Sequence, residues 1–110
     1  MAGTQFKYRG SFSELPADTL LIDVEETGSR VGWFAARLRN DDGNPESPAE
    51  ALCESSSPFT ESALILLERG YDPERTIAMV HNGREFYAMC GKLGAAAEVA
   101  RARKRDGGRS

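Results

Sequence analysis

The sequence has few of the residues from which catalytic and metal sites are built. Its 110 residues include two cysteines, Cys53 and Cys90, and one histidine, His81. A zinc site needs three or four ligands at a recognisable spacing, and no Cys-x-x-Cys pair is present. No glycine-rich phosphate loop occurs either. We therefore expect no metal, no cofactor and no enzymatic activity.

Long apolar segments are also missing. The longest unbroken aliphatic run, residues 63–67, is far shorter than the roughly 20 residues of a membrane-spanning helix. Residues 1–12 contain no apolar segment typical of a secretory signal. Two cysteines in such a chain are expected to stay reduced. We therefore expect a cytoplasmic protein without a membrane partner.

Residues 20–39 predict a β-hairpin, because two apolar, β-branched and aromatic segments flank a turn at Thr27 and Gly28. A two-residue loop places Glu25 opposite Arg30, which is a favourable cross-strand pair. Leu21 and Phe34 are then candidate apolar anchors for a partner, unless the second helix covers them. The same register puts six apolar side chains on one face: Leu20, Ile22, Val24, Val31, Trp33 and Ala35.

Residues 76–90 predict a second hairpin that turns at Asn82 and Gly83. A two-residue loop places Met79 opposite Phe86 and sets Cys90 about 20 Å from His81. That separation is too large for a Cys/His nucleophile pair.

Two helices complete the prediction. The first begins at Ser57 and Pro58, with Pro58 at the first helical position, and ends at Gly70. The second covers residues 91–105 and has a narrow apolar stripe. Its stripe consists of Leu93, Ala96, Ala97 and Ala100.

These elements predict a single small α+β domain over residues 1–105. Its antiparallel sheet consists of the two hairpins, residues 20–39 and 76–90, and both helices pack on one face of the sheet. An extra strand is expected within residues 5–12, and residues 106–110 are expected to be a disordered tail. Open sheet edges make a dimer a candidate oligomeric state.

Charge is strongly segregated along the chain, although the net charge is only −3. Residues 40–58, rich in proline and serine, predict an exposed loop, with one helical turn expected at 49–53. Residues 40–68, which cover this loop and most of the helix after it, carry acidic residues and no lysine or arginine. These acidic residues include Asp41, Asp42, Glu46, Glu50, Glu54 and Glu61. By contrast, residues 92–110 have six basic and two acidic residues, a net charge of +4.

The second half of the chain resembles a group of small bacterial hypothetical proteins of undefined function. Within residues 61–99, a Leu-Leu-x-x-Gly-x-Asp-Pro stretch leads into Met-x-His-x-Gly and then Gly-x-Ala-Ala. Arg84 and Glu85 depart from this pattern, because a small polar residue is commoner after the hairpin glycine. The resemblance implies a bacterial, cytoplasmic setting and no mechanism.

Three functional hypotheses follow. The first is a non-enzymatic binding module whose partner-binding surface comprises Asp41, Asp42, Glu46, Glu50, Glu54 and Glu61. Such an acidic surface fits a basic groove of a nucleic-acid-handling protein, as in small phage and plasmid inhibitors of similar size and acidity. The second is direct nucleic-acid contact through Arg101, Arg103, Lys104 and Arg105. The third is a small thiol-dependent enzyme, for which a pair of Cys53 and His81 stays open because a loop residue cannot be placed.

Overall fold

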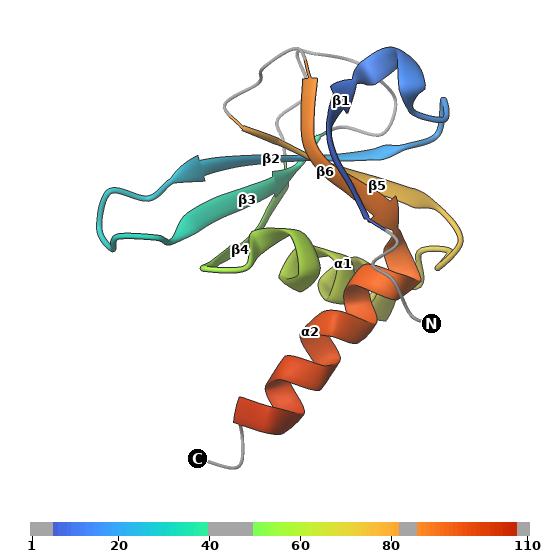
Figure 1. Ribbon diagram of the computed structural model, residues 1–110. Helices are drawn as coiled ribbons and strands as arrows, with labels where there is room; N and C mark the ends of the chain where they lie inside the picture. The colour runs from blue at the N-terminus through green and yellow to red at the C-terminus, as the bar shows by residue number, and fades with distance from the viewer. Residues whose placement is uncertain (1–5, 40–49, 82–85, 108–110) are drawn as a thin grey trace.

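The structure is a computed structural model that describes residues 6–39, 50–81 and 86–107. Its sheet and helices follow the order strand, 3-10 turn, three strands, helix, two strands, helix (Figure 1). The strands are β1 (Lys7–Ser11), β2 (Leu20–Glu26), β3 (Phe34–Leu38), β4 (Glu50–Ser55), β5 (Thr76–His81) and β6 (Phe86–Lys92). The helices are η1 (Phe12–Glu14), α1 (Pro58–Glu68) and α2 (Leu93–Gly107).

The sheet has six strands in the order β1-β6-β5-β2-β3-β4. The expected α+β class is confirmed, but the expected all-antiparallel sheet is wrong, because β2 and β5 pair in parallel. Strands β2, β3 and β4 form an antiparallel meander, and α1 then carries the chain back across the sheet to place β5 beside β2. A helical crossover of this kind is what a parallel pair requires.

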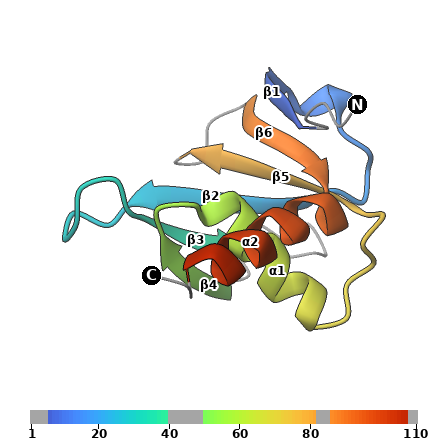
Figure 2. The same cartoon turned by 60° about the horizontal axis from the view of Figure 1, so that its bottom comes forward.

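Both helices pack on the same face of the sheet, and β1 lies beside β6 at one edge of the sheet (Figures 1 and 2). Pro58 starts α1 as expected, and Gly70 has a φ of +98°, the left-handed conformation that ends helices. The predicted stripe of α2 is fully buried. The core between sheet and helices includes Leu20, Ile22, Val24, Ala36, Leu38, Phe59, Ala63, Leu64, Leu66, Ile77, Leu93, Ala96, Ala97 and Ala100.

The first hairpin has a longer turn than expected. Glu26 pairs with Phe34, so the expected pairs of Glu25 with Arg30 and Val24 with Val31 are wrong. The turn is closed by the backbone N–H of Thr27, which donates to the Trp33 carbonyl at 3.1 Å. This register buries Ala36 and Leu38 under the helices, whereas Val31 is fully exposed. A shift of five residues also reverses the face of every side chain on β3.

The second hairpin is shifted by three residues from the expected register. Met79 pairs with Met89 rather than with Phe86, and Ala78 pairs with Cys90. The expected turn residues, Asn82 and Gly83, lie outside the described residues. This register turns Cys90 toward the sheet face opposite the helices, where it is buried.

The expected loop over residues 40–58 is wrong for its second half, because residues 50–55 form the strand β4. The helical turn expected at 49–53 is likewise wrong. Leu52 and Cys53 of this strand are partly buried against the core. This burial favours the strand, because an exposed loop would leave both side chains in water. Residues 40–49 lie outside the described residues.

The expected extra strand near the N-terminus is confirmed, whereas the C-terminal helix extends two residues further than expected. Strand β1 falls inside the expected segment 5–12. Helix α2 continues to Gly107, so the first two residues of the expected tail, 106 and 107, are helical. Over the three described ranges, no helix is both long and apolar enough to span a lipid bilayer.

The sheet face opposite the helices is covered in part by η1. Tyr87 and Cys90 are buried there, and Leu15 and Leu21 pack against them. Leu21 is therefore covered by η1 rather than by α2. Phe34 lies on the helix side of the sheet, where its ring contacts that of His81 edge to face at 5.6 Å. Neither side chain is a free apolar anchor.

Candidate functional site

The described part of the acidic segment is divided between β4 and the first turn of α1. Glu50 and Glu54 lie on β4, and Glu61 lies on α1. The other three predicted contact residues, Asp41, Asp42 and Glu46, lie outside the described residues. The described acidic side chains therefore belong to ordered elements rather than to a loop.

Strand β4 is an edge of the sheet: it pairs with β3, and no other described strand lies on its outer side. Glu50 pairs with Leu38, whereas Glu54 pairs with Ala35, since a bulge shifts the register between them. Leu38 and Ala35 point to opposite faces of β3. The bulge therefore places one carboxylate on each face of the open edge.

Charges that are far apart in the sequence partly cancel in space. Glu50 forms an ion pair with Arg69 at the end of α1. Glu61 lies 3.8 Å from the ammonium of Lys104, because α1 and α2 pack side by side. Exposed pairs of this kind contribute about 0–1 kcal/mol and exchange readily. Glu54 has no such partner among the described residues.

The predicted nucleic-acid contact residues lie on the last turns of α2, and most of them have partners within the chain. Arg101 pairs with Glu98 at 2.7 Å. Arg103 donates a hydrogen bond from Nη1 to Oγ1 of Thr60 at 3.1 Å. Together with the contact of Lys104, these bonds leave Arg105 as the cation of this set that has no partner among the described residues.

The two thiols and the imidazole have separate surroundings, and no contact joins Cys53 to His81 among the described residues. Cys53 Sγ lies 3.7 Å from the hydroxyl of Ser62, and Cys90 lies on the opposite face of the sheet. His81 packs against Phe34 in a cavity of about 280 Å³ on the helix face. In the part of the chain that the structure describes, no three His, Cys, Asp or Glu side chains are arranged to hold a metal ion.

The surroundings of the half-buried Cys53 disfavour its thiolate form. Burial raises the pKa of its thiol, and the charge of Glu61 raises it further against the opposing hydrogen bond from Ser62. Because the thiolate is the reactive form, a Cys90→Ala variant should react with a disulfide reagent at least about tenfold more slowly when folded than when unfolded. The rate should rise with pH as the thiol ionises. Fast labelling of the folded variant at neutral pH would contradict this prediction.

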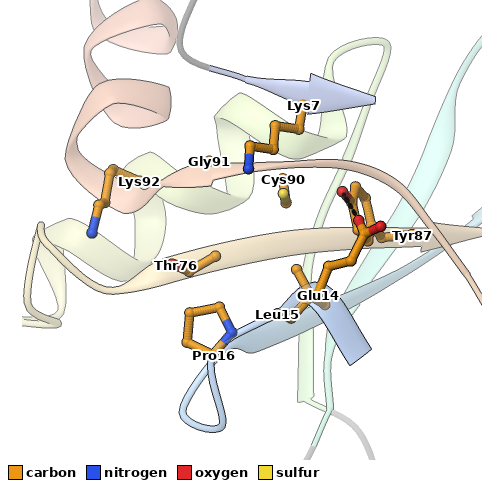
Figure 3. Close-up of a pocket in the computed structure, with 9 residues that line it drawn as sticks. All are labelled: Lys7, Glu14, Leu15, Pro16, Thr76, Tyr87, Cys90, Gly91 and Lys92. Atoms are coloured by element: carbon orange, nitrogen blue, oxygen red, sulfur yellow. Dashed lines mark hydrogen bonds between the residues drawn. The ribbon is translucent and has the colours of Figure 1, made fainter. Parts of the chain in front are cut away.

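A second cavity, of about 300 Å³, lies on the sheet face opposite the helices (Figure 3). Its walls come from β1, η1, β5 and β6. The Tyr87 hydroxyl donates a hydrogen bond to Oε1 of Glu14 at 2.9 Å, as the dashed line in Figure 3 shows. The residues that line it are Lys7, Glu14, Leu15, Pro16, Thr76, Tyr87, Cys90, Gly91 and Lys92.

No pattern in the sequence points to this cavity. Glu14 and Tyr87 are 73 positions apart, and they meet because β1 pairs with β6 across the sheet edge. Gly10 makes their approach feasible, since a Cβ atom there would overlap both the Tyr87 hydroxyl and the Glu14 carboxylate. The 3-10 turn η1, which follows β1, places Glu14 beside Tyr87.

The bond between Tyr87 and Glu14 should be visible in a pH titration. Donation to the carboxylate, reinforced by burial, raises the pKa of Tyr87 from 10.0 to about 12. A raised pKa stabilises the fold fully below pH 10, and that contribution is lost as the pH rises through about 12. We expect ultraviolet absorbance to show a tyrosine step near pH 12 that Tyr87→Phe removes and Glu14→Gln moves down. A step unchanged in Glu14→Gln would contradict the assigned cause.

Comparison of the chain with protein-family models, curated proteins and solved structures gives no match. The functional proposals below therefore depend on the geometry of the described residues. Two features stand out: an acidic sheet edge at β4 and a charged cavity on the far face.

Proposed function

We propose that the protein is a non-enzymatic binding module that adds an extended, basic segment of a protein partner to the edge of β4. The observation that carries the proposal is the pair of carboxylates, Glu50 and Glu54, on opposite faces of a sheet edge that no other described strand covers. An open edge offers unpaired backbone N–H and C=O groups to an incoming strand. The carboxylates would select for lysine or arginine on that strand.

The ion pair at this edge can be replaced at a low cost in free energy. Breaking the exposed pair between Glu50 and Arg69 costs about 0–1 kcal/mol, so a basic side chain of the partner can replace Arg69. Glu54 has no ion-pair partner among the described residues, so a basic side chain of the partner can pair with it directly. The bulge in β4 interrupts the ladder, which limits indiscriminate pairing of the edge with other chains.

A nucleic-acid-handling protein is the class of partner that we propose. Such proteins carry basic segments, and an acidic surface accelerates encounter with them in a salt-dependent way. A small inhibitor encoded by a mobile element in bacterial cytoplasm would act in this manner. The raised pKa of Cys53 and the packing of His81 against Phe34 support a binding role over a thiol-dependent reaction.

Fluorescence anisotropy with a labelled peptide tests the proposal. The probe is an extended peptide as long as the six residues of β4, with lysines on both faces. We expect saturable binding that weakens at about 1 M salt, where the Debye length is about 3 Å. The variant Glu50→Lys/Glu54→Lys should weaken binding by at least about tenfold.

A matched variant separates the edge from net charge. Asp18→Lys/Glu74→Lys makes the same change in charge at two exposed positions that lie on neither β4 nor its neighbour β3, and it should bind like the unmodified protein. Equal losses in the two variants would overturn the proposal. So would tighter binding of labelled duplex DNA or RNA that is lost in Arg101→Gln/Arg105→Gln, because it would favour direct nucleic-acid binding through α2.

A further inference from the structure

The cavity on the far face of the sheet has charges of both signs that do not contact each other. Lys7 on β1 and Glu14 on η1 both line it, yet neither is the other's partner among the described ion pairs. In Figure 3 the Lys7 side chain extends along the cavity toward Gly91, whereas the Glu14 carboxylate lies at the other end beside Tyr87. Lys92 adds a second positive charge at the rim.

We propose that this cavity binds a small amino acid with an acidic side chain. The ligand's ammonium would meet the Glu14 carboxylate, and its carboxylates would meet Lys7 and Lys92. Two lysines against one glutamate give the lining a net charge of +1, which a ligand of net charge −1 neutralises. A volume of about 300 Å³ lies at the small end of ligand sites and fits a metabolite of this size.

The negative end of the cavity is held in place before any ligand arrives. Tyr87 is buried, with 2% of its surface exposed, and its hydroxyl fixes Oε1 of Glu14. The second carboxylate oxygen, Oε2, then stays available for an ammonium group. A tyrosine hydroxyl is protonated at neutral pH, so Tyr87 remains a donor to Glu14 there.

The positive end has one anchored and one unengaged cation. Lys92 Nζ donates to the backbone carbonyl of Glu74 at 3.0 Å, which restrains its ammonium near Thr76. Lys7 has no partner among the described residues. An ammonium has three N–H donors, so each lysine can donate to a ligand carboxylate in addition to any present bond. The thiol of Cys90 and the ring of Pro16 provide apolar walls between the two ends.

Isothermal titration calorimetry of the full chain tests this inference independently of the β4 proposal. The probes are L-glutamate, L-aspartate, L-glutamine and succinate, at neutral pH. We expect an acidic amino acid to bind at least about tenfold more tightly than glutamine or succinate. Glutamine lacks the second carboxylate, and succinate lacks the ammonium.

Three variants assign the contacts. Lys7→Gln should weaken glutamate binding by at least about tenfold, whereas Lys104→Gln removes the same charge on α2 and should have no effect. Glu14→Gln should weaken glutamate binding by at least about tenfold and should not weaken succinate binding, because it removes a negative charge from the lining. All three positions are exposed, and a single cooperative melting transition verifies the fold of each variant.

Several results would overturn the inference. Failure of all four probes to bind up to about 10 mM would do so, as would succinate binding as tightly as glutamate. Glutamate affinity that is unchanged in both Lys7→Gln and Glu14→Gln would place any binding elsewhere. None of these outcomes bears on the binding of the basic peptide at β4.

Discussion

Replacing Leu66 with alanine should destabilise the protein by about 2–5 kcal/mol. Leu66 is completely buried on α1, between the sheet and α2. Truncation removes apolar contacts and leaves a cavity that tightly packed neighbours cannot fill. Small domains have a total stability of about 5–15 kcal/mol, so this one change would cost a large share of it.

Urea denaturation followed by far-ultraviolet circular dichroism measures this loss. Glu68→Ala is the matched control, because Glu68 is exposed two residues further along the same helix. We expect the control to change the free energy of unfolding by less than about 0.5 kcal/mol. Equal changes in the two variants would mean that α1 does not pack as described.

Replacing Gly10 with alanine should destabilise the protein by about 1–3 kcal/mol, although alanine suits strands better than glycine. A Cβ atom at position 10 would overlap the buried ring of Tyr87 and the carboxylate of Glu14. Since β1 is an edge strand, it can relieve the overlap by moving away from β6. The same movement should abolish any ligand binding in the cavity beneath it.

A double-mutant cycle tests the cause of this loss. Tyr87→Leu removes the ring that the new methyl group would meet, at a cost of its own in the small core of the far face. Gly10→Ala and Tyr87→Leu together should destabilise the protein by about 0.5–3 kcal/mol less than the sum of the single changes. Additive losses would show that the methyl group does not meet Tyr87.

The helices were predictable because their signals are local. Pro58 and Gly70 mark the limits of α1 through the backbone geometry of those residues alone, and the stripe from Leu93 to Ala100 needs only helical spacing. The strand registers were not. A turn at Thr27 and Gly28 looks sufficient by itself, but burial of Ala36 and Leu38 beneath the helices selects a longer turn.

The parallel pairing of β2 with β5 is the deepest departure from the sequence prediction. The segment from Glu50 to Ser55 has prolines and serines around it, which hide a strand whose burial is only partial. A prediction that lacks β4 leaves the meander with two strands. The chain then has no need to cross the sheet through α1 before the next strand. Tertiary packing against Leu52 and Cys53 therefore decides the topology, and it is not encoded in local propensity.

The candidate sites show the same division. Counting charges along the chain identified Glu50 and Glu54, but only the bulge and the strand order show that they lie on both faces of an edge. The charge count also suggested that acidic and basic surfaces lie apart. The contact between Glu61 and Lys104 shows that the two surfaces meet where α1 packs beside α2. The cavity around Tyr87 and Glu14 depends on the long-range pairing of β1 with β6, which no sequence motif predicts.

Backbone amide hydrogen exchange, measured by nuclear magnetic resonance with and without the basic peptide, tests the β4 proposal most directly. Strand addition predicts slower exchange at alternate amides of residues 50–55, because their outward N–H groups would gain hydrogen bonds, with α2 unaffected. Unchanged exchange along β4 in the presence of saturating peptide would contradict binding at this edge.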